Sequence, residues 1–188
     1  YAVRMRQFDT RLGFDQLLQR GELTTDHIDQ FADVLAEFHA GIEVFDDNSA
    51  YGKPAVVLAS VRENFEQMRQ HLSEQVDDAL RLEKFEALAR WSEATWRELE
   101  SVFCRRSEAG FVRECHGDLH LRNIVLWQGR VIPFDCIEFN PSLRRIDVMS
   151  ELAFLLMDLD DHGRHDLCAR LLNNYMEHTG DYEGLQVL

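Results

Sequence analysis

Apolar residues recur three and four positions apart along most of this chain. Segments with this helical spacing are 13–20, 24–39, 55–72, 83–106, 146–159 and 162–178. Because such spacing gathers apolar side chains on one face of a helix, each segment is predicted to be helical. The segment 146–159 is apolar nearly all round, which predicts a helix buried inside the protein.

Strand-like patterns are short. Phe111–Cys115 is β-prone, and the apolar runs Ile124–Trp127 and Val131–Phe134 flank a turn at Gln128-Gly129-Arg130. Two short apolar runs around a glycine-containing turn are typical of a β-hairpin. The chain is therefore predicted to be mainly α (α+β), with one small hairpin.

The composition is typical of a single globular domain. The chain has 188 residues, of which 45% are hydrophobic and 29% charged, enough for a sizeable core. The formal net charge of −14 disfavours nucleic acid and anionic membranes as partners, because both need a basic face. No apolar run approaches the roughly 18 residues of a membrane span, so no membrane partner is predicted.

The cysteines indicate a reducing compartment. Cys104, Cys115, Cys136 and Cys168 form no C-x-x-C pair and no zinc-binding spacing. They are typical of buried thiols in a reducing cytosol, so a cytoplasmic protein is predicted.

The residues that could carry chemistry lie around the predicted hairpin. A polar loop containing Asp118 and Asn123 leads into it, and Asp135 stands at its exit. We expect these side chains to meet at one end of the small sheet. Such a set suits phosphoryl transfer, in which one carboxylate takes a hydroxyl proton. An amide oxygen and a second carboxylate then hold Mg²⁺ against the phosphates of ATP.

The spacing within this loop is that of a kinase catalytic loop. His116-x-Asp118-x-x-x-x-Asn123 reproduces the H-x-D-x-x-x-x-N arrangement. The sequence from Cys115 to Asn123 resembles the aminoglycoside phosphotransferase branch of the kinase-like fold, which includes choline, fructosamine and homoserine kinases. Residues 134–141 and 145–148 resemble a bacterial group within that branch. Some members of that group carry a C-terminal P-loop ATPase domain.

The resemblance covers nearly the whole chain and implies the C-terminal lobe of a protein-kinase-like fold. It implies an ATP- and Mg²⁺-dependent phosphotransferase that acts on the hydroxyl group of a small-molecule substrate. Asp118 would be the catalytic base, with His116 bracing the catalytic loop. Asn123 and Asp135 would bind Mg²⁺ and, with it, the nucleotide. Asp147 would accept backbone N–H bonds from the catalytic loop.

The same resemblance divides the chain into parts. Residues 1–8 would be the last strand and the hinge of an N-terminal lobe, and 9–188 would be the C-terminal lobe. Within that lobe, 43–110 would be a helical insertion for substrate recognition, and 111–147 the catalytic loop and metal-binding hairpin. The hinge residues expected to face adenine are Met5, Arg6, Gln7 and Phe8.

The parts of a kinase that grip the phosphates from above have no counterpart in this sequence. These are the glycine-rich loop, the phosphate-binding lysine and its glutamate partner. We therefore expect a C-lobe fragment whose partner is the missing N-lobe and which is inactive without it. A fused P-loop ATPase domain is a further partner that the resemblance suggests.

A pseudokinase-like binding or regulatory module is one alternative function. The lack of an N-lobe favours it, because half of the nucleotide-binding clamp is missing. The presence of Asp118, Asn123 and Asp135 argues against it.

A metal-dependent hydrolase is a second alternative. His116-x-Asp118-x-His120 resembles part of a zinc, manganese or iron site. Such a site needs further ligands, for which His162 and His165 are the obvious donors. It also leaves Asn123 and Asp135 without a role.

Overall fold

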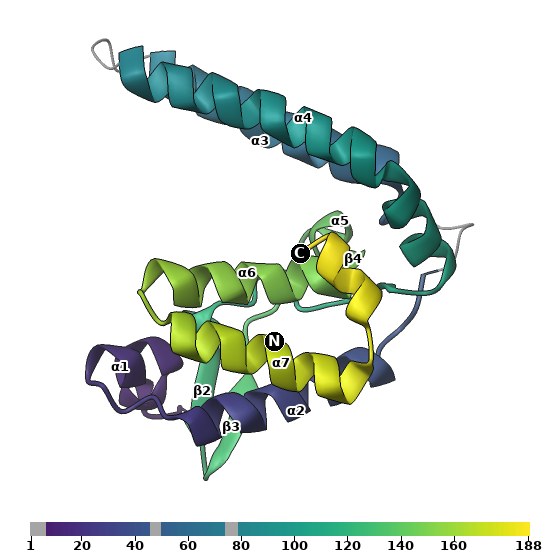
Figure 1. The fold of residues 1–188 in the computed structure, drawn as a ribbon. Coiled ribbons are helices and arrows are strands. Elements are labelled where there is room, and N and C mark those ends of the chain that lie inside the picture. The colour runs from purple at the N-terminus through teal and green to yellow at the C-terminus, as the bar shows by residue number, and fades with distance from the viewer. Residues whose placement is uncertain (1–6, 46–49, 74–78) are drawn as a thin grey trace, which may run out of the picture.

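The computed structural model describes residues 7–45, 50–73 and 79–188, and this part of the chain is mostly helical (Figure 1). Its α-helices are α1 (Phe14–Gln19), α2 (Thr25–Gly41), α3 (Pro54–Ser73), α4 (Ala79–Glu108), α5 (Pro141–Arg144), α6 (Val148–Asp161) and α7 (His165–Thr179). Its strands are β1 (Val112–Glu114), β2 (Ile124–Trp127), β3 (Arg130–Pro133) and β4 (Arg145–Asp147). Its 3-10 turns are η1 (Thr10–Leu12), η2 (Leu121–Asn123) and η3 (Tyr182–Gln186). The predicted mainly α fold is confirmed.

The core lies where α2, α6 and α7 pack together beside the β2–β3 hairpin (Figure 1). Thr24 caps the start of α2: its hydroxyl accepts a hydrogen bond from the His27 amide, while the His27 ring accepts one from the Thr24 amide. This reciprocal cap satisfies amides that the first helical turn leaves without partners. Buried side chains that these elements contribute to the core include Phe31, Ile124, Val131, Leu152 and Leu171.

The hairpin predicted between the two apolar runs is present. β2 and β3 pair antiparallel, with Val125 opposite Ile132. The turn residues Gln128 and Gly129 have φ angles of 52° and 74°. Two successive positive φ angles are what a two-residue hairpin turn requires, because they match the twist of the flanking strands.

A second strand pair departs from the sequence-based prediction. The helical pattern begins at Ile146, but Ile146 lies in β4 opposite Arg113 of β1, and α6 begins at Val148. Pairing with β1 is a long-range contact, which local periodicity does not report. The prediction is therefore wrong for the first residues of this helix.

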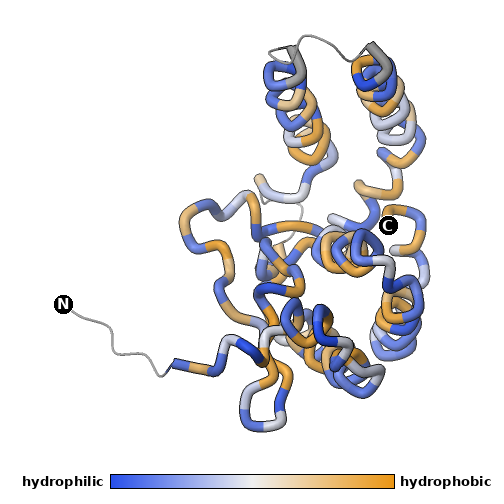
Figure 2. The backbone as a smooth tube through the Cα atoms, turned by 90° about the vertical axis from the view of Figure 1, so that its left-hand side faces the viewer, coloured by the Kyte–Doolittle hydropathy of each residue, from blue (hydrophilic) through white to orange (hydrophobic). Residues whose placement is uncertain are grey.

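α3 and α4 form a helical hairpin that projects from the rest of the protein (Figures 1 and 2). Phe65 of α3 packs edge-on against Phe85 of α4, with their ring centroids 5.6 Å apart. Arg62 of α3 donates two hydrogen bonds to the carboxylate of Glu93 on α4. Although these helices are long, none of the described helices is apolar enough over a sufficient length to cross a membrane.

Both ends of the helical hairpin are attached at β1. Before α3, the backbone of residues 43–45 forms hydrogen bonds of 2.9 Å with Val112 and Glu114 of β1. After α4, the chain turns at Gly110, whose φ is 80°, and leads directly into β1. The α3–α4 hairpin, here called the α3–α4 arm, therefore leaves and rejoins the rest of the protein at β1, the strand that precedes the catalytic loop.

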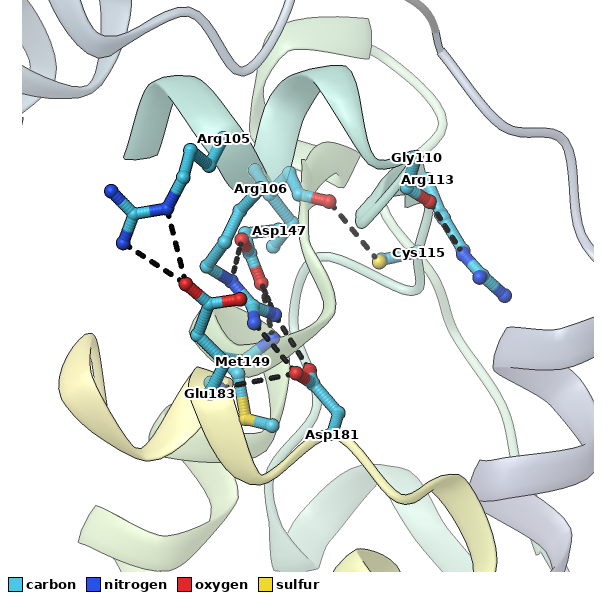
Figure 3. Close-up of polar contacts among 11 residues, drawn as sticks. Arg105, Arg106, Gly110, Arg113, Cys115, Asp147, Met149, Asp181 and Glu183 are labelled. Carbon is cyan, nitrogen blue, oxygen red and sulfur yellow. Dashed lines mark hydrogen bonds and ion pairs between the residues drawn. The ribbon is translucent and has the colours of Figure 1, made fainter. Parts of the chain in front are cut away.

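Arg106, in the last turn of α4, is 1% exposed and lies between two carboxylates (Figure 3). Its guanidinium donates to both oxygens of Asp147, at 2.7 and 2.9 Å, and to both oxygens of Asp181, at 2.7 Å each. Asp147 also caps α6 by accepting a hydrogen bond from the Met149 amide at 2.8 Å. Burial alone would lower the pKa of Arg106, but its hydrogen bonds to Asp181 and Asp147 outweigh burial and raise the pKa.

Replacing Arg106 should destabilise the fold strongly. Arg106→Met keeps much of the side-chain volume but leaves the carboxylates of Asp147 and Asp181 buried without their cation. We expect the free energy of unfolding to fall by about 3–5 kcal/mol, as measured by urea denaturation. Arg105→Met is the matched control, because Arg105 pairs with Glu183 at the surface and should cost less than about 1 kcal/mol. Equal losses in the two variants would contradict this account of Arg106.

Candidate functional site

The catalytic loop leaves β1 through a turn that only glycine fits. Gly117 has a φ of 83°, in the left-handed region. A Cβ atom at this position would lie 2.8 Å from the carbonyl oxygen of Leu143 and 2.9 Å from the Cβ of Arg144. The loop backbone therefore packs directly against the end of α5, which sets the direction in which the following aspartate leaves the turn.

Asp118 and Asn123 are in contact, as the sequence predicts. The amide nitrogen of Asn123 donates to the backbone carbonyl of Asp118 at 2.9 Å and lies 3.2 Å from its Oδ2. Asn123 is buried, whereas the side chain of Asp118 is 42% exposed. Because the amide nitrogen of Asn123 faces Asp118, the amide oxygen points the other way and can serve as a metal ligand.

Asp135 follows β3 in a backbone conformation that is uncommon for aspartate. Its φ is 64°, and it is one of few non-glycine residues with a positive φ in the described chain. The residue before it, Phe134, donates its amide to the carbonyl of Asn123 at 2.9 Å and accepts a hydrogen bond from His116 Nε2 at 2.8 Å. The backbone leading to the exposed Asp135 is thus tied to both ends of the catalytic loop.

His116 braces the loop through both of its ring nitrogens. Nε2 donates to the carbonyl of Phe134, and Nδ1 accepts a hydrogen bond of 3.3 Å from the Asp118 amide. These contacts fix the neutral tautomer that carries its proton on Nε2. With both nitrogens engaged, His116 is not available as a metal ligand, which weighs against the metallohydrolase alternative.

Acidic side chains of α6 hold the loop from below. The Gly117 amide donates to Glu151 Oε1 at 2.7 Å, and the Leu121 amide donates to Asp158 Oδ2 at 2.7 Å. A carboxylate that accepts a backbone N–H forms a charge-assisted hydrogen bond, which is stronger than a neutral one. The positions of two loop amides are therefore set by one helix.

The role predicted for Asp147 is wrong. Both of its carboxylate oxygens are engaged with Arg106, and one also accepts the Met149 amide, so Asp147 caps α6 and does not bind the catalytic loop. The acids that bind the loop are Glu151, one helical turn further along, and Asp158. One signal for Glu151 was in the sequence, because a charged residue inside a nearly all-apolar helix needs a buried partner. The neighbouring sequence does not identify that partner, because the Gly117 amide and His39 are far from Glu151 along the chain.

The predicted hinge residues are only partly placed. Met5 and Arg6 lie outside the described residues, and Gln7 is exposed. The ring of Phe8 packs edge-on against Phe134, with their centroids 4.9 Å apart. Phe8 is thereby brought next to the segment that carries Asp135, while adenine binding by these residues stays a prediction.

Two pockets adjoin the catalytic loop. One, of about 540 Å³, is mainly apolar and lies beside Asp135 and His116. The other, of about 570 Å³, lies beside His120, whose Nε2 is 3.5 Å from Asp118 Oδ2. The second pocket mixes acidic and apolar side chains of α6, including Phe154, Met157, Asp158 and Asp160.

The hairpin, the loop and the helices beneath them define the C-terminal lobe of a kinase-like fold. The chain belongs to the phosphotransferase enzyme family, which it matches over residues 14–188. A solved structure of glucosamine kinase shares the fold, with a TM-score of 0.51 and 21% sequence identity. The similarity covers 92% of this chain and 47% of that kinase.

Mycobacterial proteins are similar to this chain in sequence. They include the uncharacterized protein Rv2004c of Mycobacterium tuberculosis and the uncharacterized protein Mb2027c of Mycobacterium bovis, each 28% identical over 181 residues. The alignment covers 96% of this chain but 35% of either relative. The chain thus spans about a third of the length of these curated relatives.

Adding a methyl group at Gly117 should disturb the catalytic loop. Gly117→Ala combines an unfavourable positive φ with a clash against Leu143 and Arg144, so we expect at least about 2 kcal/mol of lost stability and a displaced loop. Gly129→Ala is the control, since Gly129 also has a positive φ but nothing lies within 4 Å of the added Cβ. It should cost only about 1 kcal/mol. Urea denaturation measures both variants, and matching losses would rule out the close approach at Gly117.

Proposed function

We propose that the protein is an ATP- and Mg²⁺-dependent phosphotransferase that acts on the hydroxyl group of a small molecule. The observation that carries this proposal is the contact between Asn123 and Asp118, in a loop whose end is tied through Phe134 to Asp135. This arrangement supplies a proton acceptor and, beside it, oxygen ligands of the kind that Mg²⁺ prefers. Membership in the phosphotransferase enzyme family supports the same reaction.

Asp118 is the group that we assign to the substrate hydroxyl. As the hydroxyl oxygen forms a bond to the γ-phosphorus and the bond from that phosphorus to the bridging oxygen of ADP breaks, Asp118 accepts the hydroxyl proton. Most of its effect comes from holding the hydroxyl in line with the phosphate rather than from strong basicity. The partly exposed carboxylate of Asp118 and its hydrogen bond to His116 suit this role, because the substrate must reach the acid while the loop stays in a fixed position.

Asn123 Oδ1 and the carboxylate of Asp135 are the ligands that we assign to Mg²⁺. An amide oxygen and an exposed carboxylate form a weak, hard-oxygen site, which leaves room for phosphate and water oxygens. When bound, the ion would neutralise the charge of the phosphates and orient the γ-phosphate. The left-handed backbone at Asp135 determines where its carboxylate is presented.

The pocket beside His120 is the place that we assign to the acceptor substrate. It adjoins Asp118 on the side of α6, and its exposed apolar side chains, Phe154 and Met157, give a small molecule a surface to pack against. Its carboxylates offer hydrogen-bond acceptors to hydroxyl or amine donors.

In kinases the phosphates of ATP are also bound by a glycine-rich loop and a lysine of the N-terminal lobe. We propose that an N-terminal lobe supplies these groups, by binding over the pocket next to Asp135 and the Phe8 side chain. Phosphotransfer would then require this lobe and the N-terminal lobe together. We also propose a fused P-loop ATPase domain as a second partner.

The proposal is tested by comparing single substitutions in the full-length protein. ATP-dependent phosphorylation is measured across hydroxyl metabolites and aminoglycosides. Asp118→Asn should lower kcat by at least about 100-fold, because the proton acceptor is lost, with little change in nucleotide affinity. Asp135→Asn should weaken nucleotide binding only when Mg²⁺ is present.

Glu177→Gln is the control for these variants, since Glu177 is an exposed acid on α7 that lines neither of the two pockets. It should behave like the natural protein. Full activity in Asp118→Asn, or Mg²⁺-independent nucleotide binding in the natural protein, would refute the assignment.

A further inference from the structure

Three buried polar side chains form a hydrogen-bonded chain beneath the catalytic loop. Tyr175 of α7, His39 of α2 and Glu151 of α6 are all buried. The Tyr175 hydroxyl lies 2.7 Å from His39 Nδ1, His39 Nε2 lies 2.8 Å from Glu151 Oε2, and Glu151 Oε1 accepts the Gly117 amide at 2.7 Å. These hydrogen bonds thus run from α7 through α2 and α6 to Gly117, the residue before Asp118.

The chemistry of the partners gives each hydrogen bond a direction. An ionised carboxylate only accepts, so His39 must carry a proton on Nε2 to bond Glu151. A neutral imidazole with its proton on Nε2 has an acceptor at Nδ1, which the Tyr175 hydroxyl satisfies. Burial raises the pKa of Tyr175, so its hydroxyl keeps the proton that it donates. Every group in the chain is then paired.

The opposite tautomer of His39 would break this chain. A proton on Nδ1 would turn the lone pair of Nε2 toward the Glu151 carboxylate, and the two acceptors would repel each other. Glu151 would then have to turn away or take up a proton, and the Gly117 amide would lose a charge-assisted partner. The Glu151 carboxylate excludes this tautomer, and the Tyr175 hydroxyl adds to the preference, because a proton on Nδ1 would leave the buried hydroxyl hydrogen without an acceptor.

The same residues could be considered as a metal site, because His39, Glu151 and Cys115 place ligand atoms within 4.8 Å of one another. Both ring nitrogens of His39 are already engaged, however, and both oxygens of Glu151 have donors. Burial raises the pKa of the Cys115 thiol, which disfavours the thiolate that a metal requires. The hydrogen-bonded chain accounts for these groups without an ion.

We propose that Tyr175 is a positioning residue for the catalytic loop, because its hydroxyl holds the ring of His39 in place and, through that ring, the carboxylate of Glu151. Among the described residues, the Tyr175 side chain forms no hydrogen bond with the loop or with any residue assigned to substrate. Its effect on rate rests on the proposed function, whereas its effect on the loop does not.

The test removes one hydroxyl group from the full-length protein. Tyr175→Phe keeps the ring and its packing, and Tyr182→Phe is the matched control, because Tyr182 is an exposed tyrosine on η3. Nitrogen-15 NMR of labelled histidine, with His39 assigned through His39→Gln, reports the tautomer. Amide hydrogen exchange reports the protection of Gly117.

In the natural protein we expect His39 to carry its proton on Nε2. In Tyr175→Phe we expect the same tautomer, because the Glu151 carboxylate still requires it, but a shifted Nδ1 resonance and roughly tenfold faster exchange at Gly117, as the loss of one buried hydrogen bond implies. We also expect about a tenfold lower kcat with KM for both substrates within about twofold of normal. Tyr182→Phe should change none of these quantities.

Each outcome bears on the proposal separately from the proposed function. A proton on Nδ1 in the natural protein would overturn the proposal without any variant, as would an unchanged Nδ1 resonance and unchanged Gly117 exchange in Tyr175→Phe. If the Nδ1 resonance and the exchange shift but the natural protein transfers no phosphate, the positioning role stands and the proposed function fails. Glu151→Gln provides a second variant, and its effect on exchange should not add to that of Tyr175→Phe.

Discussion

The position of α6 depends on an arginine that is buried between two carboxylates. Removing a guanidinium from water costs several kcal/mol unless its donors find partners, and Arg106 meets that condition through Asp147 and Asp181. The contact is specific because a planar guanidinium matches a carboxylate in only a few orientations. Since Asp147 is also the N-cap of α6, the same ion pair determines where this helix starts and how it lies against α4.

From that start, α6 presents a row of acids that serve different purposes. Asp147, Glu151 and Asp158 are separated by four and seven residues, so they lie on one face of the helix. The first meets the buried arginine, while the other two meet the amides of Gly117 and Leu121 in the catalytic loop. A single rigid helix therefore links the framework of the lobe to the loop, which leaves little freedom for Asp118 to move.

Local patterns were enough to predict much of this protein. Helical periodicity located the long helices, the glycine turn located the hairpin, and the spacing from His116 to Asn123 brought together residues that are in contact. Such patterns could not predict which partner each acid of α6 binds. Arg106 is 41 residues from Asp147, and Gly117 is 34 residues from Glu151, so only the folded chain distinguishes the acid that serves the framework from the one that serves the loop.

The attachment of the α3–α4 arm has a consequence for how this protein could diversify. Because the chain departs for α3 and returns from α4 at neighbouring points of β1, the arm is a detour whose length the lobe does not constrain. Extending or trimming such a detour changes the entropy of the chain only slightly. The surface that the arm offers to other molecules can therefore be remodelled over generations while the reacting groups stay where they are.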